Sequence, residues 1–343
     1  MDRKRIWDVD RMNHAEKIYF VTGMTGYIGK TIVNKLLAED LGENVHIIGL
    51  VHDKSKAQIL FGEENKNRLT YIQGDIIHFD SYMSELKGQK LIPDYIIHCA
   101  APTKSAYMIS NPVETTESIV VGTRNVLELA KHYQVKSMVY LSSMEVYGQI
   151  ECKPDRRITE EELGNIDLFD VRSCYPLGKR MAESLCFSYF KEYGVPVKIA
   201  RLAQTFGKGV QKNDTRVFAQ FAGAVREKKD IVLHTAGDSV GNYCEIEDAV
   251  EAIFLLLEKG ENGEAYNVAN EANTMRIREM AELVADKIAH GEIRVVYDIP
   301  ESNLHGYAAT TGLRLSSQKL RQMGWRPKKD LETMYRDMLY SEE

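Results

Sequence analysis

Tyr175 and Lys179 have the residue types and the spacing that acid–base chemistry requires. They stand four residues apart at the start of a segment with helical periodicity, so both side chains lie on one face of the predicted helix. A free phenol has a pKa of about 10 and exchanges protons poorly at neutral pH. A neighbouring ammonium favours the phenolate, so we expect it to lower the pKa of Tyr175. The same spacing also arises by chance in helices, and the pair therefore needs support from the rest of the chain.

Ser142 and Ser143 supply part of that support, because they end an apolar run of strand length at 137–143. In a parallel sheet this strand end lies at the edge where the following helix begins, which is the edge where ligands bind. A hydroxyl there can hydrogen-bond a carbonyl or hydroxyl of a substrate. Ser143 is therefore a candidate catalytic residue, and Ser142 is a candidate substrate contact.

A glycine-rich segment at 23–29, GMTGYIG, directly follows the first apolar run and opens the first helical segment. Glycines allow a tight turn and close backbone approach, and the N-terminus of the helix then faces the pyrophosphate of a dinucleotide. The GxxGxxG spacing differs by one residue from the GxGxxG fingerprint, and its position after a strand favours a binding loop over a ligand-free turn. The predicted contacts of the pyrophosphate are Gly23, Thr25, Gly26, Tyr27, Ile28 and Gly29.

Two further strand ends extend the predicted dinucleotide site. Asp75 and Ile76 close the third apolar run, where a carboxylate can accept a hydrogen bond from an adenine amino group. Ala100 and Ala101 close the fourth run, where small side chains leave room for a nicotinamide ribose.

Short apolar runs alternate with helical segments through the first two hundred residues. The six runs lie at 18–23, 45–51, 69–75, 94–100, 137–143 and 197–203. Continuous apolar strands separated by helices predict an α/β fold with a doubly wound parallel sheet covered on both faces. The less regular remainder predicts a smaller mixed α/β lobe over the carboxyl edge of that sheet.

The motifs TGMTGYIGK, GDI, HCAA, VGTRNVLELAK, LSSMEVYG, YPLGK, RLAQTFG and LRQMGWRP stand in this order from about Lys17 to the C-terminus. With them the sequence resembles the extended short-chain dehydrogenase/reductases of the NAD-dependent epimerase/dehydratase family. Within the family it is most similar to paralogues of bacterial capsule and cell-wall sugar gene sets.

The resemblance implies a Rossmann domain, a bound nicotinamide cofactor and hydride transfer to or from a carbon of a sugar nucleotide. It also implies Tyr175 as the acid–base residue, Lys179 on the cofactor ribose and Ser143 as the hydroxyl partner. The expected division is an N-terminal arm at 1–16, an NAD(P)-binding domain at 17–203 with 230–260, and a substrate-binding lobe at 204–229 and 261–343. Members of the family pair through the helices expected here at about 113–132 and 174–193, which implies a homodimer.

The turn after the second strand departs from the pattern of NAD enzymes, which carry an acidic residue at that strand's end. Here His52, Asp53 and Lys54 follow the strand, so the carboxylate comes late and a lysine follows it. This basic turn favours NADP(H) over NAD(H) as the cofactor, although an ordinary solvated turn has the same composition.

Glu145 is a candidate base, but it follows Met144 where dehydratases of the family have aspartate. The missing general acid argues against 4,6-dehydratase activity, because elimination needs both proton transfers. A structural hydrogen bond is the alternative role for Glu145. Gln204 replaces the usual asparagine, and Gly241 replaces an arginine that grips the nucleotide diphosphate. The candidate substrate contacts are Ser105, Ser142, Gln204 and Arg216.

Composition excludes several classes of protein. The formal charge of −6 and the absence of a basic stripe argue against a nucleic-acid partner. The start of the sequence has no apolar signal core, and its apolar runs are too short to span a bilayer. The five scattered cysteines and nine dispersed histidines predict reduced thiols in a cytoplasmic protein without a metal site.

Three functions remain compatible with the sequence. The first is an NAD(P)-dependent oxidoreductase or epimerase of a sugar nucleotide in cell-surface polysaccharide biosynthesis. The second is an NADPH-dependent reductase of a sugar phosphate, such as a pentulose phosphate converted to a polyol phosphate. The third is a cofactor-sensing scaffold without chemistry, against which the presence of Ser143, Tyr175 and Lys179 argues.

Overall fold

The central sheet contains seven parallel strands. The computed structural model describes residues 16–38, 44–150, 156–300 and 312–341, so the expected N-terminal arm lies outside the described residues except for residue 16. The strands are β1 (Lys17–Thr22), β2 (Val45–Val51), β3 (Leu69–Gln73), β4 (Tyr95–His98), β5 (Ser137–Ser143), β6 (Val197–Leu202) and β10 (Ala265–Val268). Their spatial order is β10-β6-β5-β4-β1-β2-β3, and every neighbouring pair is parallel. This confirms the predicted doubly wound α/β fold.

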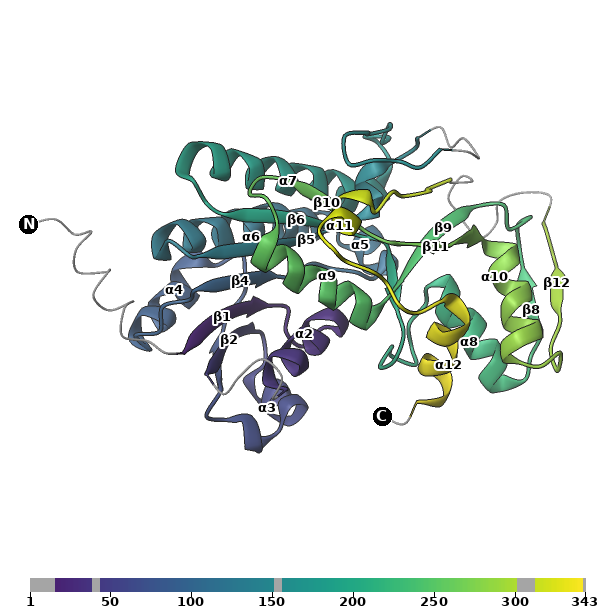
Figure 1. Cartoon of the computed structure of the whole chain (residues 1–343), viewed down its shortest axis with the longest axis horizontal. Coiled ribbons are helices and arrows are strands. Elements are labelled where there is room, and N and C mark those ends of the chain that lie inside the picture. The colour runs from purple at the N-terminus through teal and green to yellow at the C-terminus, as the bar shows by residue number, and fades with distance from the viewer. Residues whose placement is uncertain (1–15, 39–43, 151–155, 301–311, 342–343) are drawn as a thin grey trace, which may run out of the picture.

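Neighbouring residues of the central strands pack into two different cores. In β1, Tyr19 and Val21 belong to one core, whereas Ile18 and Phe20 belong to the other. Helices α2 (Tyr27–Leu37), α3 (Lys54–Phe61) and α9 (Ile246–Lys259) cover the first face, and α4 (Phe79–Gly88), α6 (Pro112–Tyr133) and α7 (Cys174–Tyr193) cover the second (Figure 1). Burial on both faces explains why the strands are continuous apolar runs.

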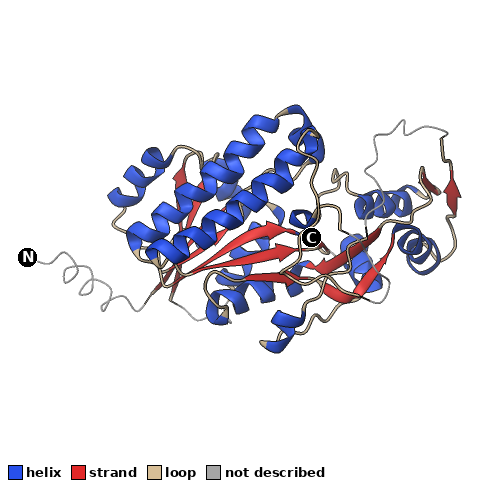
Figure 2. Ribbon diagram, turned by 90° about the horizontal axis from the view of Figure 1, so that it is seen from above, coloured by secondary structure: helices blue, strands red, loops and turns tan. Residues whose placement is uncertain are grey.

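The smaller lobe surrounds an apolar core of its own. Its elements are β7 (Gln204–Phe206), α8 (Val217–Glu227), β8 (Ile231–Leu233), β9 (Val240–Glu245), β11 (Asn270–Arg276), α10 (Ile277–Leu283), β12 (Val295–Tyr297) and α12 (Leu331–Tyr340). Strands β11, β9 and β7 form a mixed sheet, and β12 pairs with β8. Phe206 and Phe218 stack with their ring centres 4.3 Å apart in this core. The strands of the large sheet point toward this lobe (Figure 2).

The structure divides the chain differently from the expected boundaries at two strands. β8 lies within 230–260 but pairs with β12 in the small lobe rather than joining the large sheet. β10 lies within 261–343 but pairs with β6 as the seventh strand of the large sheet, where Tyr266 and Val268 complete the core under α9. The helix α9 does pack on the large sheet, as expected. No helix among the described residues is both long and apolar enough to cross a membrane.

Candidate active site

The glycine-rich segment forms a compact turn between β1 and α2. Gly23 has a φ of +66°, and a Cβ at this position would lie 2.9 Å from the amide nitrogen of Ala100. A Cβ on Gly29 would lie 2.2 Å from the carbonyl oxygen of Gly23, so the helix packs directly on the turn. Gly26 precedes the helix, and a Cβ at Gly26 would contact only the carbonyl oxygen of Gly23, at 3.2 Å. The open side of this turn is therefore at Gly26.

This turn fits the pyrophosphate of a dinucleotide. No side chain caps the first turn of α2, and that turn carries no acidic residue. Its first amides therefore remain available to an anion, which the positive end of the helix dipole also attracts. Thr25, Tyr27 and Ile28 are half-buried on the turn. The Tyr27 hydroxyl donates to the carbonyl oxygen of Lys208 at 3.1 Å, which ties the turn to the smaller lobe.

A buried threonine holds the ends of β1 and β4 together beside this turn. Thr22 Oγ1 accepts hydrogen bonds from the amides of Cys99 and Ala100, each at 3.2 Å, and lies 2.7 Å from His98 Nδ1. Burial, assisted by the charge of Lys179, lowers the pKa of His98 to about 3. The imidazole is therefore neutral. Ala100 is half-buried beside Gly23, and Ala101 next to it in the chain is also half-buried.

The turn after β2 has structural contacts that the sequence analysis does not include. The Asp53 carboxylate caps α3 by accepting the amide hydrogen of Lys56 at 3.1 Å. Lys54 Nζ donates to Glu85 of α4 at 2.7 Å, so its charge is already paired. His52 is exposed. Asp53 and Lys54 would have to leave these contacts to bind a ribose or a 2′-phosphate, which weakens the argument for NADP(H).

The loop after β3 carries the two residues of the predicted adenine contact. Asp75 is half-buried, and its Oδ1 accepts the amide hydrogen of Ile77 at 3.1 Å. Ile76 is buried, and its carbonyl oxygen accepts a 2.9 Å hydrogen bond from Asn125 of α6.

Tyr175, Lys179 and Ser143 come together at the carboxyl end of β5. Tyr175 and Lys179 are buried on successive turns of α7, and Lys179 Nζ lies 5.8 Å from the centre of the Tyr175 ring. Lys179 Nζ also donates to the carbonyl oxygen of Leu141 at 2.7 Å. The Ser143 side chain interacts with the Tyr175 phenol, and its Oγ accepts the amide hydrogen of Glu145 at 3.2 Å.

Burial dominates the proton affinities of the two helical residues. It raises the pKa of Tyr175 above its usual 10, and the Glu145 carboxylate raises that pKa further. The interaction with Ser143 and the charges of Arg172 and Arg216 act in the opposite direction. Burial lowers the pKa of Lys179 to about 8, against the opposing effect of nearby acidic groups. The prediction of a lowered pKa for Tyr175 is wrong for this arrangement, because burial outweighs the nearby positive charges.

The Ser142 hydroxyl is used in a buried hydrogen-bond network beside α7. It donates to Glu183 of α7 at 2.5 Å, and Glu183 also accepts hydrogen bonds from Arg201. Successive strand residues face opposite sides of a sheet, and it is Ser143 whose side chain interacts with Tyr175. The buried contact with Glu183 argues against Ser142 as a substrate contact. Arg201 is likewise unsuited to hold a diphosphate, because it is buried in this network.

Glu145 forms an ion pair with Arg172, a residue that the sequence analysis misses. Arg172 Nη2 donates to Glu145 Oε1 at 2.8 Å, and Arg172 Nε donates to Ser105 Oγ at 3.0 Å. Arg172 precedes Tyr175 by three residues, and this spacing on the turn that enters α7 is the signal that could have found it. The exposed Ser105 is thus held near the site, as expected of a substrate contact.

The smaller lobe contributes Arg216 and Gln204. Arg216 precedes α8, pairs with Asp214 at 2.6 Å and is close enough for its charge to act on Tyr175. Gln204 begins β7 and is half-buried, and its Oε1 is buried without a hydrogen-bond partner among the described residues. An unpartnered buried acceptor is suited to a ligand donor, which supports the predicted substrate contact.

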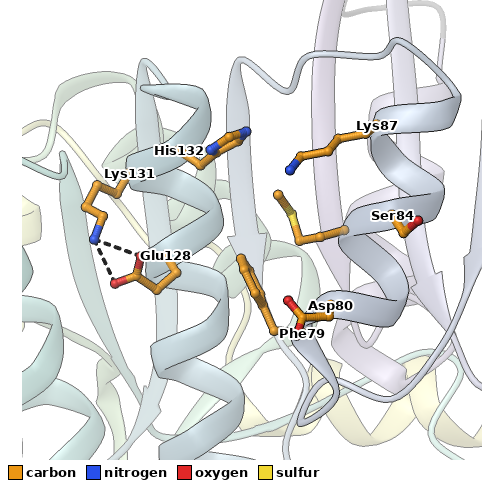
Figure 3. A pocket seen from close by; sticks show the side chains of 8 residues that line it. Phe79, Asp80, Ser84, Lys87, Glu128, Lys131 and His132 are labelled. Atoms are coloured by element: carbon orange, nitrogen blue, oxygen red, sulfur yellow. Dashed lines mark hydrogen bonds and ion pairs between the residues drawn. The ribbon is translucent and has the colours of Figure 1, made fainter.

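A groove of about 360 Å³ between α4 and α6 contains none of the predicted site residues (Figure 3). Among the described residues, no cluster of three or more His, Cys, Asp or Glu side chains could hold a metal ion. Four cysteines are free thiols, and Cys152 lies outside the described residues.

Comparisons with known proteins show the family and the fold. The family model described as "NAD dependent epimerase/dehydratase family" matches residues 19–269. UDP-glucuronic acid decarboxylase 6 of Arabidopsis thaliana is 30% identical over 282 residues, which cover 82% of this chain and 77% of that protein. The structure of UDP-glucose 4-epimerase from Thermotoga maritima with UDP-glucose matches with a TM-score of 0.77 at 22% identity, covering 94% of this chain and 97% of that chain. The structure of RMD from Pseudomonas aeruginosa complexed with NADPH matches with a TM-score of 0.72 at 25% identity and the same coverages, 94% and 97%.

Proposed function

Because the chain belongs to the NAD-dependent epimerase/dehydratase family, we propose that it oxidises or reduces a carbon of a sugar nucleotide with Tyr175 as the acid–base residue. The observation that carries this proposal is that Ser143, Tyr175 and Lys179 come together at the carboxyl end of β5. This is the edge of the sheet where the glycine turn after β1 also opens. An acid–base group thus lies at the same edge of the sheet as a turn suited to a dinucleotide.

Each group has a separate role in the proposed reaction. The turn at 23–29, with Ala100 and Ala101, would hold the dinucleotide, and Lys179 would hold its ribose. When bound, the nicotinamide gives or takes the hydride of the reacting sugar carbon. Tyr175 exchanges the proton of the oxygen on that carbon, and Ser143 orients the same oxygen. Which of NAD(H) and NADP(H) binds depends on the exposed His52 and the paired Lys54.

The proposed reaction is an oxidoreduction or epimerisation in cell-surface polysaccharide biosynthesis, carried out in the cytoplasm. Met144 beside Glu145 argues against 4,6-dehydration, because the expected general acid is missing. The similarity to the Arabidopsis decarboxylase supports a sugar nucleotide as the substrate. The enzyme is proposed to be a homodimer paired through α6 and α7, where Val113, Met181 and Phe187 are exposed apolar side chains.

Replacing Tyr175 by phenylalanine tests the proposal. The change removes the proton path but little binding area, so turnover should fall about 10²- to 10⁴-fold, the usual contribution of general acid–base catalysis, with cofactor affinity nearly kept. Tyr140→Phe is the matched control, because this phenol is also buried near Lys179, whose Nζ lies 4.8 Å from its ring. Turnover close to wild type in Tyr175→Phe would show that the assignment is wrong.

A sugar phosphate reductase is the second candidate, and Gly241 favours it. A Cβ at this position would lie 2.8 Å from the Tyr243 hydroxyl, so the space beside β9 is filled by a tyrosine rather than by a diphosphate-binding arginine. The absorbance and mass of cofactor released from the purified protein separate the two candidates. Tightly held NAD indicates internal redox cycling on a sugar nucleotide, whereas a cofactor-free protein that consumes NADPH indicates a net reductase.

A further inference from the structure

Arg172 lies beside the Tyr175 phenol in an arrangement that stability does not explain. Its guanidinium carbon lies 5.3 Å from the centre of the Tyr175 ring, while two of its nitrogens bind Ser105 and Glu145. Its Nη1 is buried and has no hydrogen-bond partner in the part of the chain that the structure describes. An unsatisfied buried donor costs free energy, and partly exposed ion pairs contribute little to stability. A role in the chemistry accounts better for this geometry.

Glu145 and Arg172 act on the Tyr175 phenol with opposite signs. The negative carboxylate disfavours the phenolate and raises the pKa of Tyr175, whereas the positive guanidinium favours the phenolate and lowers it. Because the two groups are joined by a 2.8 Å ion pair, their effects oppose each other at the phenol while the pair is intact. Removing one partner leaves the other charge unbalanced beside a buried hydroxyl.

We propose that Arg172 and Glu145 form one charge-balanced pair that sets how readily the Tyr175 phenol releases and accepts its proton, with Arg172 as a positioning residue. The inference rests on the proposed role of Tyr175 as the acid–base residue. Loss of either partner alone changes the proton affinity of the phenol, and the two losses act in opposite directions. Loss of both partners restores the balance.

Other charged and titratable groups also face this pair. Lys179 lies on the next turn of α7, Tyr140 lies in β5, and Arg216 reaches the phenol from the start of α8. Cys174 precedes Tyr175 and interacts with both members of the pair. All of these groups are unchanged in variants of Arg172 and Glu145, so they contribute the same background to each measurement.

The test is an NMR titration of the whole protein labelled with ¹³C at tyrosine Cζ, which needs no substrate. The signal absent from Tyr175→Phe identifies Tyr175. Its titration midpoint should move down by about one pH unit or more in Glu145→Gln and up by a similar amount in Arg172→Met. In the double variant the midpoint should return close to the wild-type value. Methionine keeps the aliphatic bulk beside the ring, and glutamine keeps the shape of Glu145.

Arg180→Met is the matched control for a purely structural effect. Arg180 Nε donates to the carbonyl oxygen of Val146 at 2.7 Å, so it supports the turn that carries Glu145, but its charge is not among the largest effects on Tyr175. Its loss should leave the midpoint unchanged. Shifts of the same sign in both single variants, or no shift in either, would overturn the inference. An active Tyr175→Phe enzyme would instead overturn the proposed function, whatever the titration gives.

Discussion

Replacing Lys179 by methionine should stabilise the cofactor-free fold and abolish the chemistry. Lys179 is 3% exposed, and burial lowers its pKa from 10.5 to about 8. At neutral pH this shift corresponds to about 3 kcal/mol for keeping the ammonium charged in the folded state. Methionine removes that cost but leaves the carbonyl oxygen of Leu141 without its 2.7 Å donor, a loss of about 1 kcal/mol. The free energy of unfolding should therefore rise by about 2 kcal/mol at pH 7.

The size of this gain should depend on pH in one direction. Below pH 8 Lys179 is protonated in the folded and unfolded states, so the wild type carries the full cost of the buried charge. Between about pH 8 and the unfolded value of 10.5, the folded state releases this proton first. The unfolded state then binds more protons, and the wild type becomes more stable relative to the variant. Urea unfolding of both proteins across this pH range measures the difference between their free energies of unfolding. Other buried residues titrate in both proteins, so their contributions cancel in this difference.

Lys198→Met is the matched control, because Lys198 is a buried lysine remote from the chemistry. It lies near the amino end of β6, is 4% exposed, and has a pKa that burial lowers to about 8. Its Nζ donates to Ser137 Oγ at 2.7 Å. This variant should show the same trend of stability with pH and keep its activity. The reasoning is refuted if Lys179→Met is less stable than the wild type at pH 7, or if the difference does not narrow above pH 8.

Two further predictions concern the glycine turn and the assembly. Gly26→Val should abolish cofactor binding with the fold intact, because a Cβ at this position meets only the carbonyl oxygen of Gly23, at 3.2 Å. Gly29→Ala should instead destabilise the fold, because its Cβ would lie 2.2 Å from the same oxygen. Calorimetric titration with NAD⁺ and NADP⁺, beside urea unfolding, separates the two effects, and unchanged cofactor affinity in Gly26→Val contradicts the assignment. Met181→Glu should convert a dimer into monomers, because it places a charge on the exposed apolar part of α7. If sedimentation shows only monomer for the wild type at micromolar concentration, the proposal of a homodimer is wrong.

The central sheet could be predicted from the sequence because its strands are buried on both faces. Continuous apolar runs such as 45–51 are what a parallel sheet between two helix layers requires, and all six predicted runs contain strands of that sheet. The seventh strand, β10, could not be assigned in this way. It has four residues, and its place beside β6 depends on an edge that exists only after the rest of the sheet has formed.

The candidate site could be predicted only in part, because several of its contacts depend on the direction of a side chain. Two of the differences between the predicted and observed contacts follow from rules about neighbouring residues in the sequence. Ser142 must face away from Ser143 on a strand, and an aspartate directly before a helix, such as Asp53, is a typical N-cap. The ion pair of Arg172 with Glu145 joins segments 27 residues apart in the sequence. No local pattern specifies such a contact, because a long side chain can reach several neighbours.

The end of β5 shows how a buried ion pair can support chemistry carried by the same helix. Ser142 donates to Glu183, which receives two nitrogens of Arg201, and Arg201 Nη1 also donates to the Tyr147 hydroxyl at 3.1 Å. Burying two charges costs several kcal/mol per ion unless the partners are well placed, so this network constrains every residue that joins it. Tyr147 ends the short helical turn at 144–147, which begins at Ser143 and carries Glu145. The network therefore holds α7 through Glu183 and the turn at 144–147 through Tyr147, and so helps to position Tyr175 relative to Ser143 and Glu145.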